Sequence, residues 1–104
     1  MYDARITLLA ESFDANAFGE MVSTTTSHTI WAQITSTTRA EFYAAGEHGH
    51  KPSLVAITHY TNYGGEELVS LNGKKYVIYR TYRDDRSDDI ELYLERRVGN
   101  GTDG

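Results

Sequence analysis

Residues 67–79 read ELVSLNGKKYVIY, and this stretch decides the fold class. At its centre, Asn72-Gly73 separates two runs that are rich in β-forming side chains. An Asn-Gly pair suits the left-handed backbone of a type I′ turn, so it is the strongest short-range signal of a β-hairpin. We therefore predict two antiparallel strands that are joined at this pair.

A second hairpin is predicted downstream, between residues 75–82 and 89–95, with the charged segment 83–88 as its loop. In its last strand, apolar side chains alternate with polar or amphipathic ones, which is typical of a strand with one buried face. The expected core side chains of this strand are Ile90, Leu92 and Leu94.

The first half of the chain predicts shorter strands, because its apolar runs are brief and turn residues interrupt them between positions 14 and 20. Residues 21–26 are the weakest of these segments, although their threonines favour extended backbone. The next strand places Ile30, Ala32 and Ile34 on one face. The expected strands are residues 5–9, 21–26, 28–35 and 54–60. Together these patterns predict an all-β fold, a small β-barrel that is SH3-like or related, with one short helix and long loops.

The helical signal is Thr38-Arg39-Ala40-Glu41, which matches a capping box. In that motif the threonine hydroxyl and the glutamate carboxylate each accept a hydrogen bond from a free amide at the helix start. We expect a helix over residues 39–45 that Gly46 ends. Isolated helices shorter than about 12 residues are marginal in water, so this one needs to pack on the barrel, through Phe42 and Ala45.

The composition fits one small domain. The chain has 104 residues, of which 39% are hydrophobic and 24% charged, and it has no cysteine for a disulfide or a thiolate metal site. We expect one barrel domain over residues 1–98 and a disordered polar tail over residues 99–104. The first residues carry charges and no long apolar run, so we expect no signal peptide or membrane span, and a soluble protein made in the cytoplasm. The net charge of −5 has the wrong sign for tight binding of nucleic acid.

The sequence contains no recognisable catalytic constellation. His48 and His50, with Glu41 and Glu47 nearby, come closest to a metal site, but no third ligand stands at a recognisable spacing. No serine lies in a nucleophile elbow. We therefore expect no catalytic residues, no metal and no cofactor. A small metalloenzyme centred on the two histidines is the least favoured alternative.

Eight tyrosines are many for a chain of this length. Tyrosine combines a large apolar face with a polar hydroxyl, so a surplus of it often marks an interface, with ordinary barrel packing as the alternative. Neither face of the first hairpin is wholly apolar, so some of its side chains would be partly exposed in a monomer and covered by assembly. The interface candidates are Tyr60, Tyr63, Leu68, Tyr76, Tyr79 and Tyr82.

Five short segments occur in a distinctive order. They are RITL (residues 5–8), WAQI (31–34), RAEFYAA (39–45), LNGKKYVI (71–78) and IELYL (90–94). In this order they resemble the head-closure (stopper) proteins of the bacteriophage head-tail joining family, over about residues 4–98.

The resemblance implies a virion structural protein of the head-tail connector. Such a subunit is a small β-barrel that assembles with itself as a ring, of about twelve copies in the family, below the portal-adaptor proteins. It closes the head, helps to retain packaged DNA, and presents a surface to the tail completion protein. DNA would pass through the channel without tight binding, because like charges repel.

The resemblance also implies a moving part, because residues 36–52 correspond to a segment that projects toward the ring channel and helps to block DNA exit. The channel candidates are Ser36, Glu41, Phe42, Tyr43, Gly46, Glu47, His48, His50 and Lys51. We expect a monomer in solution whose amides in this segment exchange quickly. The loop GEHGHK differs from the longer glutamine-rich or apolar stretch of the family, so a joining role without a plug stays open. An SH3-like module that binds a peptide or ligand is the alternative from another functional class.

Overall fold

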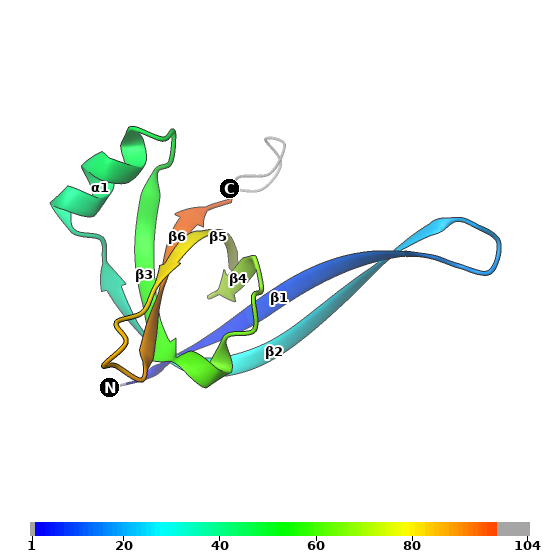
Figure 1. Cartoon of the computed structure of the whole chain (residues 1–104), viewed down its shortest axis with the longest axis horizontal. Helices are drawn as coiled ribbons and strands as arrows, with labels where there is room; N and C mark the ends of the chain where they lie inside the picture. Colours follow the sequence, from blue (N-terminus) through cyan, green and yellow to red (C-terminus); the bar gives the residue numbers. More distant parts are fainter. Residues whose placement is uncertain (1, 98–104) are drawn as a thin grey trace.

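The computed structural model describes residues 2–97 and shows a closed antiparallel β-barrel with one short helix (Figure 1). Its elements are β1 (Ala4–Ala15), β2 (Met21–Ser36), α1 (Arg39–Gly46), β3 (Pro52–His59), the 3₁₀ turn η1 (Tyr60–Asn62), β4 (Leu68–Leu71), β5 (Lys74–Tyr82) and β6 (Asp89–Arg96). The strand order around the barrel is β1-β2-β3-β6-β5-β4. The predicted all-β barrel with a short helix is confirmed. The tail predicted for residues 99–104 lies outside the described residues.

The core consists of alternate side chains from the six strands. Its buried members are Ile6, Leu8, Ile30, Ala32, Ala56, Val69, Leu71, Tyr76, Leu92 and Leu94. Ile34 and Ile90 pack against this cluster, so the core faces predicted for β2 and β6 are confirmed. Burying one large aliphatic side chain contributes about 1.5–3 kcal/mol, which makes this cluster the main source of stability.

The β4–β5 hairpin has the predicted turn. Asn72 and Gly73 both adopt the left-handed backbone, with φ of 52° and 79°, and Leu71 pairs with Lys74 on either side of them. Both central residues of a type I′ turn need positive φ, which explains the Asn-Gly pair. The β5–β6 hairpin is confirmed as well, with an irregularity in register between Ile78 and Arg80.

β1 and β2 are longer than predicted, and their far halves leave the barrel as a projecting hairpin (Figure 1). We call residues 10–27 the arm. The prediction that the first strand ends at Leu9 is wrong, and the two segments predicted at 21–26 and 28–35 are one continuous strand. The turn forms because the side chain of Asn16 accepts hydrogen bonds from the amides of Phe18 and Glu20, at 2.8 and 3.0 Å.

Helix α1 begins where the capping motif predicts, since the Thr38 hydroxyl accepts a hydrogen bond from the Glu41 amide at 3.1 Å. Its end differs from the prediction. Gly46 is the last helical residue and has no left-handed backbone; the left-handed glycine that turns the chain toward β3 is Gly49, with φ of 83°. Within residues 2–97, no helix is long and apolar enough to cross a membrane.

Candidate functional site

Polar contacts attach α1 to the barrel wall. Glu41, in the first turn of the helix, accepts hydrogen bonds from the Tyr79 hydroxyl at 2.6 Å and from Arg80 Nε at 3.2 Å. A second guanidinium nitrogen of Arg80 contacts the other carboxylate oxygen. Both partners come from β5. The second half of the capping-box prediction is therefore wrong, because the Glu41 carboxylate contacts Tyr79 and Arg80 of the barrel instead of returning to the helix start.

These contacts keep the carboxylate and the guanidinium charged. The hydrogen bond from Arg80 lowers the pKa of the Glu41 carboxyl, although burial opposes this shift. The same hydrogen bond raises the pKa of Arg80. Burial, reinforced by the bond to Glu41, raises the pKa of Tyr79, so its hydroxyl stays protonated and donates. The Arg80 guanidinium also lies 3.8 Å from the centre of the Tyr93 ring, a cation–π contact that holds it in place.

A second attachment follows the helix. His50 Nδ1 lies 3.0 Å from Glu95 Oε1, and the Lys51 amide donates to Glu95 Oε2 at 2.9 Å. The His50 ring stacks on the Tyr79 ring with centres 4.8 Å apart. The hydrogen bond from His50, then that from the Lys51 amide, lowers the pKa of Glu95. We call Glu41, His50, Tyr79, Arg80 and Glu95 the α1 tether.

A hollow of about 440 Å³ lies between α1 and the barrel. Its lining residues are Glu41, Ala44, Ala45, His48, His50, Tyr79 and Arg80. Only Ala45 of the helix is buried, so apolar packing contributes little to holding α1. The expected packing of Phe42 is wrong, since its side chain is 49% exposed. Among residues 2–97 no three His, Cys, Asp or Glu side chains gather as metal ligands would.

Most of the other channel candidates face solvent. Tyr43 is 65% exposed and lies edge-on to Phe42, with ring centres 6.0 Å apart. Exposed residues of this segment also include Gly46, Glu47, His48 and Lys51. Ser36 is the last residue of β2, and His50 belongs to the α1 tether. The segment thus presents two apolar rings to solvent while polar groups hold its inner side.

The interface candidates divide into three kinds of environment. Tyr76 is only 7% exposed and belongs to the core, so its role is ordinary barrel packing and not an interface. Tyr79 belongs to the tether, and Tyr63 is partly buried with its hydroxyl donating to the Glu66 carbonyl at 2.9 Å. Surface positions are Tyr60 and Tyr82, which are exposed, and Leu68, which is partly buried.

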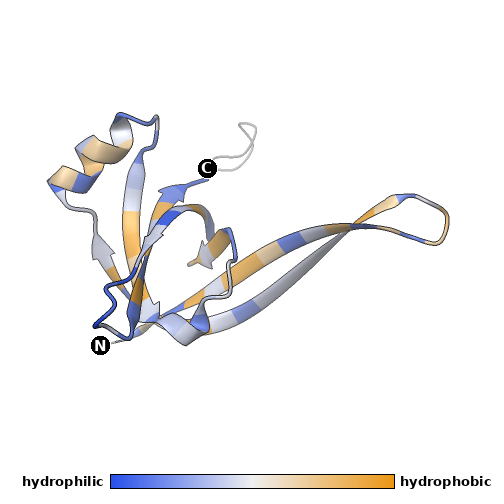
Figure 2. Cartoon of the chain, in the orientation of Figure 1, coloured by the Kyte–Doolittle hydropathy of each residue, from blue (hydrophilic) through white to orange (hydrophobic). Residues whose placement is uncertain are grey.

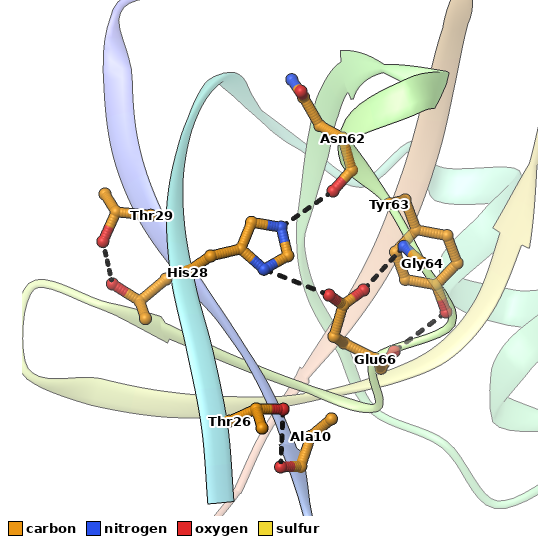
Figure 3. A network of polar contacts seen from close by, with 9 residues as sticks. Ala10, Thr26, His28, Thr29, Asn62, Tyr63, Gly64 and Glu66 are labelled. Atoms are coloured by element: carbon orange, nitrogen blue, oxygen red, sulfur yellow. Dashed lines mark hydrogen bonds and ion pairs between the residues drawn. The ribbon is translucent and has the colours of Figure 1, made fainter.

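A polar network fastens the root of the arm to the barrel (Figure 3). His28, on β2, directs Nε2 to the Asn62 carbonyl at 3.1 Å and Nδ1 to the Glu66 carboxylate at 3.3 Å. The same carboxylate accepts from the Gly64 amide at 2.7 Å. The arm therefore leaves the barrel from a fixed base, and its free part begins beyond this point.

Arg80, Tyr93 and Glu95 were not among the sequence candidates, although they complete the α1 attachment. No local signal identifies Arg80 and Glu95, because they lie 39 and 45 residues from the groups that they contact, Glu41 and His50. Tyr93 acts on Arg80 from the neighbouring strand β6. No protein-family model matches the chain, and the comparison with curated proteins finds no match.

Proposed function

We propose that this chain is a structural subunit of a phage head-tail connector, a head-closure protein that assembles as a ring below the portal-adaptor. In that role it helps to retain packaged DNA, presents a surface for tail attachment, and performs no catalysis. The proposal comes from the ordered resemblance of the sequence, and three features of the molecule support it.

The observation that carries the proposal is the way in which α1 is held. A head-closure subunit needs an element that changes position while the barrel stays folded. The helix buries a single side chain, and its attachment consists of the polar groups of the tether. Elements with few buried apolar contacts open locally at low cost in free energy. The helix can therefore leave the barrel wall without disturbing the core.

The exposed rings of Phe42 and Tyr43 fit an element that meets another surface after assembly. Exposed aromatic side chains that lie side by side are characteristic of contact sites. The net charge of −5 suits a channel through which DNA slides, because it disfavours adhesion to a polyanion.

The deciding experiment measures, by cosedimentation, the binding of the purified chain to isolated portal-adaptor rings. We expect saturable binding, and we expect the mass of the complex to increase by that of one ring of subunits. Saturable binding of a cellular peptide, without binding to the rings, would instead support the SH3-like module.

A substitution then tests the role of α1. Replacing both Phe42 and Tyr43 with serine should leave the chain bound to DNA-filled heads while increasing the DNA that becomes accessible to nuclease. Trp31→Ser is the matched control, because this ring is about as exposed, at 53%, but lies on the barrel strand β2. Equal leakage from the two variants would contradict a channel role for α1.

A further inference from the structure

Within the part of the chain that the structure describes, the arm is a two-stranded ribbon without a third layer or strand to support it. Every side chain from residue 11 to residue 29 is exposed, including Phe13 and Phe18, the latter at 87%. Figure 2 shows apolar residues near the far end of the arm as well as on the barrel strands. An isolated two-stranded hairpin is marginally stable in water, so an arm of this length needs a partner to hold its shape.

The backbone edges of the arm are free, in contrast to those of the closed barrel. On one side, β4 pairs with β1 only at residues 7–9, so the β1 edge from Ala10 to Ala15 has no strand beside it among the described residues. On the other side, β3 pairs with β2 only at residues 33–36. Free edges are templates for pairing with another chain.

The β2 edge lacks the features that normally prevent such pairing. Residues 21–27 read MVSTTTS, without a charge or a proline, and their register with β1 is continuous, without a bulge. Proteins usually protect free edges with lysine, proline or bulges. Threonine and valine also have high β propensity. This edge is suited to accept a further strand.

The β1 edge offers a shaped place beside it. A hollow of about 390 Å³ lies where β4 stops, and its lining residues are Leu9, Ala10, Glu11, Phe13, Gly65, Glu67 and Leu68. It lies on the side of β1 that β4 occupies nearer the barrel. A strand entering there would continue the sheet in line with β4.

Charge decides which edge of a second copy fits this place. Glu11 and Asp14 lie on the β1 edge, and no lysine or arginine occurs between Arg5 and Arg39. Pairing of two β1 edges would bring carboxylates against carboxylates, and like charges across strands are destabilising. The β2 edge instead brings uncharged hydroxyl groups that can donate hydrogen bonds to these carboxylates.

We propose that the β2 edge of one copy pairs with the β1 edge of the next, so that the arms form a continuous intersubunit sheet. Two different edges meet in this contact, which makes it head-to-tail, and a head-to-tail contact closes into a ring when its rotation closes. Arms that point the same way bring the two strands together antiparallel. The inference rests on the proposed ring and assigns the surface that builds it.

Disulfide cross-linking tests this assignment cleanly because the described chain has no cysteine of its own. Ser12 and Thr24 are cross-strand partners and so share one face of the arm. Neighbouring antiparallel strands hold Cα atoms about 4.5–5.5 Å apart, within the range that a disulfide spans. Ser12→Cys chains would be mixed with chains that carry Val22→Cys, Thr24→Cys or Thr26→Cys, so that the possible registers on that face are covered.

The expected result is a cross-linked dimer in at least one mixture and none from any of these variants alone. Thr25→Cys is the matched control, since it faces Glu11 on the opposite side of the ribbon and should not cross-link to Ser12→Cys. Cross-linking of Ser12→Cys to itself would overturn the head-to-tail pairing. High protein concentration drives pairing in a chain that is a monomer when dilute. Absence of any cross-link at the highest concentration would therefore overturn edge pairing altogether, whether or not the unsubstituted chain binds portal-adaptor rings. Failure of that binding alone would overturn only the proposed connector role.

Discussion

Glu41→Gln should loosen α1 while leaving the barrel intact. The glutamine keeps an oxygen that can accept from Tyr79 but loses the charge that pairs with Arg80. A hydrogen bond between charged partners contributes about 1.5–3 kcal/mol and a neutral one about 0.5–1.5 kcal/mol. The two ranges differ by about 1–1.5 kcal/mol, and the expected loss is no larger than this because the Arg80 side chain is 42% exposed and water partly screens its charge.

Since about 1.4 kcal/mol corresponds to a factor of ten, amides in α1 should exchange up to about ten times faster. Native-state hydrogen exchange followed by NMR measures this directly. The Phe42 amide is a suitable reporter because it bonds to the Thr38 carbonyl at 3.0 Å, and Leu92 reports on the barrel core.

Glu66→Gln is the matched control, because Glu66 accepts a hydrogen bond from the Gly64 amide at 2.7 Å and contacts His28 at the root of the arm, away from the α1 tether. It should leave exchange in α1 unchanged. The reasoning is refuted if Glu41→Gln leaves the helix amides unchanged, or if helix and core amides accelerate by the same factor, because α1 would then open only with the whole molecule.

Three further predictions follow from the same structure. The pKa values of Glu41 and Glu95 are lowered in the folded protein, so their stabilisation of α1 is complete at neutral pH and is lost as the pH falls below about 4. In an acid titration followed by NMR, the amide resonances of α1 should therefore shift at a higher pH than those of the barrel. Leu92→Ala, at a fully buried position, should reduce the free energy of unfolding measured by urea denaturation by about 2–5 kcal/mol. Phe18→Ala, on the exposed arm, should change it by less than about 0.5 kcal/mol, and equal effects of the two substitutions would contradict the assigned core. Gly73→Ala should cost about 1 kcal/mol in the same assay, because φ there is 79°, and a neutral result would argue against the type I′ turn.

Local signals in the sequence were sufficient for some elements. The Asn72-Gly73 hairpin was predictable because its turn residues and both strands are adjacent in the chain. The start of α1 was predictable for the same reason, since the Thr38 hydroxyl caps an amide three residues away. In both cases the physical cause lies within a few neighbouring residues.

Other features had no local signal. Alternation of apolar and polar residues reveals a strand only when one face is buried, and the arm has no buried face, so its length could not be read from the pattern. Closure of the barrel depends on residues 7–9 meeting residues 68–70, far apart in the chain. The contact between His50 and Glu95 likewise depends on the completed barrel, which brings the start of β3 beside the end of β6.

The length of β2 has a mechanical consequence. Its 16 residues extend about 50 Å at the usual strand rise, close to the longest dimension of the molecule, 49 Å. This single strand begins at Met21 beside the arm turn and ends at Ser36, two residues before the Thr38 cap of α1. No flexible loop interrupts the path, so a pull or twist applied to the arm travels along hydrogen-bonded backbone to the base of the helix. Once a neighbouring strand supports the arm, β2 is therefore a continuous mechanical link between that contact and the helix α1.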